Sequence, residues 1–178
     1  MKRFFKKLIR KIRGQGPSLE ELREKGVELG ENCHVYGTID YGHGFLVKIG
    51  DNVTLASGSK IFTHDGSTKK IVGYSRVGLV EIGNNVFVGA GAIILPNVKI
   101  GNNVIIGAGA VIAKNIPDNS LVVGNPAKII GTYEDYEKKV RNQFQNLPVW
   151  NVSFDNKTEQ QKKEMIETLK NSGYGFDV

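Results

Sequence analysis

The sequence lacks the features of a disulfide-bonded, membrane-spanning or secreted protein. Cys33 is the only cysteine among 178 residues, so no disulfide can form within the chain. No apolar run approaches the roughly 20 residues that a bilayer-spanning helix needs. The basic N-terminus is not followed by the apolar stretch of a secretory signal. We therefore expect a cytoplasmic protein in which Cys33 is a small, buried core residue.

The net positive charge of the chain is confined to its N-terminus. Residues 1–14 contain seven lysines and arginines and no acidic residue, so the formal net charge of +6 falls to −1 for the rest of the chain. A near-neutral body argues against a nucleic-acid partner. Apolar residues in this segment have helical spacing: Phe4, Phe5, Leu8, Ile9 and Ile12. The pattern predicts a basic amphipathic helix that either contacts an anionic membrane surface or docks on the protein itself.

A six-residue repeat runs without a gap through the middle of the chain. Large aliphatic residues recur at Ile82, Val88, Ile94, Ile100, Ile106 and Ile112. The residue four places after each is also apolar, and the residue directly after each is usually glycine. This period matches neither the 3.6 residues of a helix nor the 2 residues of a strand, which excludes ordinary helices and hairpins.

The repeat predicts an all-β solenoid of the parallel β-helix type. Each repeat would form one flat side of a prism, and three repeats would complete a coil of 18 residues. The aliphatic residues would point inward and stack on their equivalents in adjacent coils. Turns such as Gly83-Asn84-Asn85 fit this arrangement, because Asn and Gly tolerate left-handed backbone angles.

Two breaks in the register divide the chain into segments. The repeat slips between Val35 and Ile49 and again between Ile61 and Ile82, and the second slip predicts a loop extruded from the prism over residues 64–80. The expected organisation is a basic amphipathic segment over residues 1–14, a short helix within 15–28, the β-helix over 29–131 and a helical extension over 132–178. A Ser18/Glu21 capping box begins the short helix.

Three segments carry a resemblance to a known family. They are IGNNVFVGAGAIILPNVKIG from Ile82, GAGAVIAKNIP from Gly107, and GNPAK from Gly124. Together they resemble the hexapeptide-repeat acyltransferases, most closely the maltose, galactoside and polysaccharide O-acetyltransferases. The resemblance covers about residues 29–131. It implies a left-handed β-helix with short helical extensions, a homotrimer, and acetyl-CoA as a co-substrate in a groove between adjacent prisms, with no bound cofactor or metal.

Three histidines are candidates for the chemistry that this family performs. Acyl transfer to an alcohol needs a base, and a neutral imidazole suits that task. His64 lies where the extruded loop leaves the prism, in the stretch where the resembling enzymes have their base, and we predict it to be catalytic. Asp65 is expected to orient that imidazole or to contact a sugar hydroxyl. His43 lies in the other register break and is expected to line the acceptor pocket, whereas His34 is expected to be structural or exposed.

The resemblance also implies six residues of a coenzyme groove. Backbone groups near Ala90, Ala108 and Ala113 would face the pantetheine arm, Phe87 would form a bulky wall, and Lys114 and Lys128 would meet the phosphates. The alternative for each lysine is a solvated surface charge.

These observations predict an acetyl-CoA-dependent O-acetyltransferase that acts on a sugar hydroxyl in surface polysaccharide biosynthesis. N-acetylation of an amino sugar is the alternative within the same class. The γ-type carbonic anhydrases share the prism but need three zinc-binding histidines, and the histidine spacings of 9 and 21 do not fit their pattern. A non-catalytic solenoid is the third alternative, and it leaves the histidine loop without a role.

Overall fold

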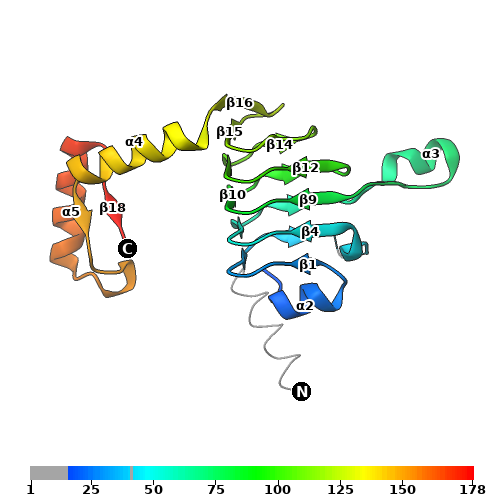
Figure 1. Cartoon of the computed structure of the whole chain (residues 1–178). Coiled ribbons are helices and arrows are strands. Elements are labelled where there is room, and N and C mark those ends of the chain that lie inside the picture. Colours follow the sequence, from blue (N-terminus) through cyan, green and yellow to red (C-terminus); the bar gives the residue numbers. More distant parts are fainter. Residues whose placement is uncertain (1–15, 41) are drawn as a thin grey trace, which may run out of the picture. The chain divides into compact units, whose positions relative to one another are not determined.

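The computed structural model describes residues 16–40 and 42–178. The predictions for residues 1–14 therefore lie outside the described residues. The chain divides into two compact units, one ending at Tyr133 and the other formed by Glu134–Val178. The first unit is a stack of coils built from short strands, and Figure 1 shows these strands lying one above another.

Three sheets form the sides of the prism. Sheet A contains β1 (Glu28–Leu29), β4 (Val47–Ile49), β9 (Val80–Ile82) and β12 (Val98–Ile100). Sheet B contains β2 (His34–Val35), β5 (Thr54–Leu55), β10 (Val86–Val88), β13 (Val104–Ile106), β15 (Ser120–Val123) and the antiparallel end strand β16 (Lys128–Gly131). Sheet C contains β3 (Thr38–Ile39), β6 (Lys60–Ile61), β11 (Ile93–Ile94) and β14 (Val111–Ile112). All other pairings within these sheets are parallel, which confirms the predicted parallel β-helix.

The interior of the prism consists of the repeating aliphatic residues. Every large aliphatic residue of the gapless run is at most 3% exposed, and Ile106 is fully buried. Parallel pairing places Ile82 beside Ile100 in sheet A and Val88 beside Ile106 in sheet B. Successive coils therefore bury each other's inward side chains, as the repeat predicts.

The turns between strands show why asparagine recurs in the repeat. Asn85 and Asn103 have φ angles of 55° and 54°, in the left-handed region that asparagine tolerates. Their side chains also form a ladder across the coils, with Asn85 Nδ2 donating to Asn103 Oδ1 at 3.1 Å. Cys33 is buried as predicted, and its thiol donates to the carbonyl oxygen of Gly50 at 3.2 Å.

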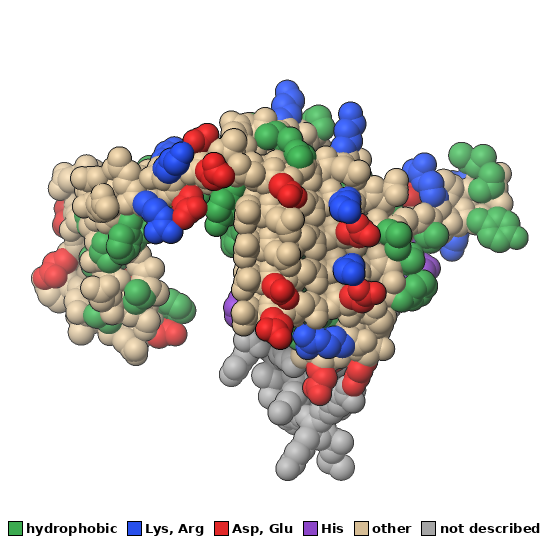
Figure 2. Space-filling view, viewed as in Figure 1, with side chains coloured by type: hydrophobic (Ala, Val, Ile, Leu, Met, Phe, Trp, Pro, Cys, Tyr) green, Lys and Arg blue, Asp and Glu red, His purple; other side chains and the backbone are tan. Residues whose placement is uncertain are grey.

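Sheet A has an outer face of alternating charge. Its parallel register aligns Glu28, Lys48, Glu81 and Lys99 in one row across the strands. Ion pairs join Lys48 to Glu28 at 3.3 Å and Lys99 to Glu81 at 3.2 Å. Figure 2 shows basic and acidic side chains alternating over this face. Because the row alternates in sign, in-register stacking does not bring like charges together.

Apart from the short α3 (Lys69–Val72) of the second register break, the α-helices lie near the two ends of the described chain. Helix α2 (Leu19–Glu24) begins with the predicted Ser18/Glu21 capping box. The second unit contains all of α4 (Tyr133–Asn146) except its first residue, followed by β17 (Val149–Trp150), η3 (Phe154–Asn156), α5 (Glu159–Ser172) and β18 (Phe176–Asp177). Within this unit, buried Lys157 forms an ion pair with Asp177 at 2.6 Å. None of the described helices combines the length and the apolarity that crossing a membrane requires.

Each register break replaces part of a coil with irregular structure. The first contains the short η1 turn (Gly44–Leu46). The second contains β7 (His64–Asp65), η2 (Gly66–Thr68), α3 (Lys69–Val72) and β8 (Arg76–Val77), with β7 and β8 paired antiparallel. This second segment projects from the prism in Figure 1. Its side chains Ile71 and Tyr74 are 84% and 78% exposed.

Candidate active site

Both register breaks leave the prism at the same corner. Strands β3 and β6 are neighbours in sheet C, with Ile39 opposite Ile61. The chain departs from the regular coil directly after each of these residues. Asp40 and His43 follow β3, whereas Thr63 and His64 follow β6. Stacking of adjacent coils therefore brings together polar residues that are more than 20 positions apart in the sequence.

His64 and Asp40 form a hydrogen-bonded pair at this corner. Nδ1 of His64 contacts Oδ2 of Asp40. The Asp40 side chain is only 7% exposed, whereas that of His64 is 40% exposed. An ionised carboxylate can only accept, so Nδ1 of His64 carries the proton and Nε2 of the neutral ring has a free lone pair. The pair thus holds the imidazole in the tautomer that a base requires.

Asp40 is fixed by donors on several sides. The buried Thr63 hydroxyl donates to Asp40 Oδ2 at 2.7 Å, and the Gly42 amide donates to Oδ1 at 3.1 Å. Burial by itself raises the pKa of Asp40. The hydrogen bonds from Thr63, His64 and Gly42 outweigh that effect, so the pKa of Asp40 falls from 3.8 to about 2. Asp40 is therefore a carboxylate throughout the physiological pH range.

The substitution Asp40→Asn tests whether the hydrogen bonds to ionised Asp40 stabilise the folded chain. A depressed pKa means that ionised Asp40 stabilises the folded state above pH 3.8, and that this contribution is lost as the pH falls through about 2. We expect Asp40→Asn to lower the free energy of unfolding at pH 7 by on the order of 1 to 3 kcal/mol. The deficit should shrink as the pH falls from 4 towards 2. Urea unfolding at each pH measures it, with exposed Asp155→Asn as a control for charge loss. A deficit that does not change with pH would contradict the account.

His43 completes a cluster with this pair. Its Nδ1 lies 3.8 Å from Asp40 Oδ2, too far for a hydrogen bond, and its ring centre lies 5.4 Å from that of His64. Nδ1 of His43 is buried and has no hydrogen-bond partner among the described residues. The His43 ring also packs edge to face against the ring of Phe45, with 6.0 Å between the two ring centres. The structure therefore places His43 beside His64, and its role in lining an acceptor pocket stays a prediction.

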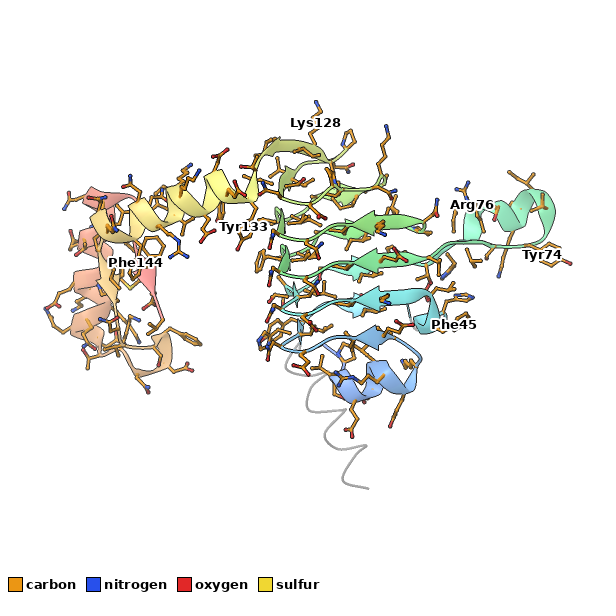
Figure 3. The ribbon with its side chains drawn as sticks, viewed as in Figure 1. Phe45, Tyr74, Arg76, Lys128, Tyr133 and Phe144 are labelled. Atoms are coloured by element: carbon orange, nitrogen blue, oxygen red, sulfur yellow. The ribbon has the colours of Figure 1, made fainter. Side chains whose placement is uncertain are left out.

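Asp65 does not contact the imidazole of its neighbour. Its carboxylate accepts from the Ser67 amide at 2.9 Å and from the Ser67 hydroxyl at 2.6 Å, and it pairs with Arg76 at 3.0 Å. The bonds from Ser67 are the main reason that the pKa of Asp65 is lowered. Figure 3 labels Arg76 on the projecting segment. Asp40, and not Asp65, hydrogen-bonds His64, which leaves contact with a sugar hydroxyl as the expected role of Asp65.

Comparison with known proteins identifies the family of this chain. Residues 80–114 match the family described as "Bacterial transferase hexapeptide (six repeats)". Protein CapG of Staphylococcus aureus is 44% identical over 142 residues, which cover 76% of this chain and 83% of CapG. The chain belongs to the hexapeptide-repeat transferase family. This result confirms the predicted family and the prediction of an acyltransferase.

Solved structures of family members have the same fold. A maltose O-acetyltransferase from Clostridium difficile 630 is 37% identical, with a TM-score of 0.52. The match covers 60% of this chain and 59% of that enzyme. A galactoside acetyltransferase in complex with coenzyme A is 29% identical, with a TM-score of 0.51, and the match covers 64% of this chain and 58% of that one. This chain thus spans less than two thirds of either enzyme, and the shared part is the left-handed β-helix that the sequence predicts.

Four of the six predicted coenzyme residues of this hexapeptide-repeat transferase lie along two corners of one prism, and the other two lie elsewhere on it. Ala90 and Ala108 are exposed at the corner between sheets B and C. Ala113 and Lys114 are exposed directly after β14, at the corner where His64 also lies. Phe87 is on the outer face of sheet B, 46% exposed. Lys128 begins β16 and points into solvent at the end of the prism in Figure 3. These six positions do not converge on one pocket within a single chain.

Asp40 and Thr63 were not among the site residues predicted from the sequence. The available signal was the position of Asp40, which directly follows the inward-facing Ile39, where equivalent coils have Phe62, Leu95 and Ala113. An acidic residue at an otherwise apolar position indicates a local partner. Recognising His64 as that partner requires the pairing of Ile39 with Ile61, and the register break hides this pairing in the sequence.

Proposed function

We propose that this chain transfers an acetyl group from acetyl-CoA to a hydroxyl of a sugar, with neutral His64 as the general base. The His64–Asp40 pair at the corner of the β-helix carries the proposal. The related maltose and galactoside acetyltransferases support the reaction type and the acceptor class. The acceptor belongs, in this proposal, to surface polysaccharide assembly.

The reaction needs one proton to be moved twice. Nε2 of His64 takes the proton from the acceptor hydroxyl as its oxygen attacks the thioester carbonyl carbon. The imidazolium is stabilised by the Asp40 carboxylate at Nδ1. The tetrahedral intermediate collapses with breakage of the C–S bond, and the imidazolium returns the proton to the departing CoA sulfur. No acyl-enzyme forms, because the acceptor oxygen attacks the thioester directly.

A homotrimer is part of the proposal. The predicted coenzyme residues lie on two corners, one face and the end of one prism and do not converge, and a groove shared between two prisms would account for this separation. The full chain should therefore sediment at micromolar concentration with about three times the monomer mass of 19.6 kDa. A monomer with full activity would contradict the shared groove.

We further propose that the enzyme is cytoplasmic and contacts the inner membrane face through residues 1–14. Their seven basic residues would bind anionic lipid, at about 1 kcal/mol for each residue near the surface. Deletion of residues 1–14 should abolish sedimentation with anionic vesicles, and high salt should weaken it for the full chain. Undiminished vesicle binding after the deletion would place the contact elsewhere.

The proposed activity is tested by a screen of acceptors. The full chain is incubated with acetyl-CoA and maltose, galactosides or amino sugars, and free thiol release is followed with a chromogenic reagent. We expect release above the rate without acceptor, and mass spectrometry with mild alkali treatment identifies a labile O-acetyl product. An alkali-stable product from an amino sugar would replace O-acetylation with N-acetylation. Release that no acceptor stimulates would count against the proposal.

A further inference from the structure

The side chains of Asp40, His43 and His64 could together bind a metal ion, a function that the proposed general-base mechanism does not use. Asp40, His43 and His64 each offer one potential metal-ligand atom, and these atoms all lie within 4.8 Å of one another. Asp40 and His64 bond to each other, but Nδ1 of His43 is buried and has no hydrogen-bond partner among the described residues. A buried ring nitrogen beside a carboxylate, too far away to bond to it, needs an explanation.

We propose that Asp40, His43 and His64 bind a divalent transition-metal ion of the Zn²⁺ type, and that this ion reversibly inhibits the enzyme. Two imidazole nitrogens and one carboxylate oxygen are a ligand set that suits Zn²⁺, whereas Mg²⁺ and Ca²⁺ prefer oxygen ligands alone. Tetrahedral Zn²⁺ with bonds of about 2.1 Å separates its ligand atoms by roughly 3.4 Å. Small rotations of the three side chains would reach that spacing from the present one.

The surroundings of Asp40 support a metal site. The Thr63 hydroxyl and the Gly42 amide hold the carboxylate from both oxygens, at 2.7 Å and 3.1 Å. Partners of this kind orient metal-ligating carboxylates. His43 follows Asp40 by three residues on the first register break, and His64 comes from the second, so both segments provide a histidine close to the same carboxylate oxygen. The fourth position of the ion would be open to water.

Inhibition follows from the tautomer of His64, and this step rests on the proposed function. Without metal, the single ring proton of neutral His64 is on Nδ1 and bonds to Asp40. An ion bound at Nδ1 moves that proton to Nε2, and the number of protons on the ring does not change. Nε2 then has no free lone pair and cannot accept the acceptor's proton. The bound ion therefore prevents His64 from acting as the general base, and it does so without displacing the coenzyme.

Cobalt provides a test that does not depend on activity. Metal-free, untagged full chain is titrated with Co²⁺, and the intense visible absorption of tetrahedral Co²⁺ is followed. We expect one saturable site, with Zn²⁺ displacing Co²⁺ and Mg²⁺ having no effect. His43→Ala and His43→Asn should each weaken binding by about tenfold or more. His34→Ala is the matched control, because His34 lies on β2 in another sheet, and it should bind like the wild type.

Inhibition is measured separately, relative to each protein's own metal-free rate. Zn²⁺ should inhibit the wild type, EDTA should restore the rate, and both His43 variants should need about tenfold more Zn²⁺ for half inhibition. Equal Co²⁺ binding by wild type and both His43 variants would overturn the site. Tetrahedral Co²⁺ binding without Zn²⁺ inhibition would overturn the inhibitory role. The proposed base fails by a different result, namely full metal-free activity of His64→Ala.

Discussion

His64→Ala should lower the turnover number by about a hundredfold to ten-thousandfold, the usual range for loss of a general base. A sugar hydroxyl is a weak nucleophile until its proton is removed, and an alanine has no group to remove it. The Asp40 carboxylate would remain but is only 7% exposed, and it is held by Thr63 and Gly42. Coenzyme binding should be nearly intact, because the base acts on the acceptor side.

The measurement is acceptor-dependent thiol release, with coenzyme binding followed by calorimetry. His43→Ala should lower the turnover number far less and should act mainly on the KM for the acceptor, because His43 lies beside the base without bonding to it. If His64→Ala turns over within about threefold of wild type, the base is not His64, and His43 becomes the next candidate.

The histidines of the site were predictable because a solenoid makes interruptions visible. A gapless six-residue register defines where each coil should continue, and the only two slips contain His43 and His64. Loops that leave a rigid scaffold are common sites of function. The contact of Asp40 with His64 was not predictable in the same way, because it depends on how two irregular segments fold back across adjacent coils. Asp65 is next to His64 in the sequence, but its carboxylate bonds to Ser67 and Arg76 instead.

The prism could be predicted in more detail than the rest of the fold. Its period fixes which residues point inward, and all six members of the gapless run are buried. Helices α4 and α5 lie within the helical extension that was expected over residues 132–178. Neither helix contains a buried residue, so the sequence has no core pattern that would fix which face of each helix packs inward. The projecting segment has no repeat to define it, so its β7–β8 pairing and the short α3 emerged only from the structure.

Ile100→Asp and Ile106→Asp should each prevent stable folding of the β-helix. Ile100 is 1% exposed and lies between Ile82 and Ile116 in adjacent coils, and Ile106 is fully buried beside Val88 and Val122. An aspartate at either position would lose the apolar packing and bury a charge without a partner, which together cost several kcal/mol. Typical domains are stable by only about 5 to 15 kcal/mol, and coils bury their faces only against one another, so the loss should spread along the stack.

Far-UV circular dichroism and urea unfolding measure this effect, and two controls separate it from a general response to mutation. Ile100→Val keeps an apolar residue and should cost about 0.5 to 1.5 kcal/mol. Lys99→Gln changes the neighbouring outward residue, which forms an exposed ion pair with Glu81, and should cost about 0 to 1 kcal/mol. The aspartate variants should lose the β signal that both controls keep. Wild-type spectra and unfolding midpoints in Ile100→Asp and Ile106→Asp would show that these side chains do not face the interior, because a buried position could not accept an unpaired charge without a large loss of stability.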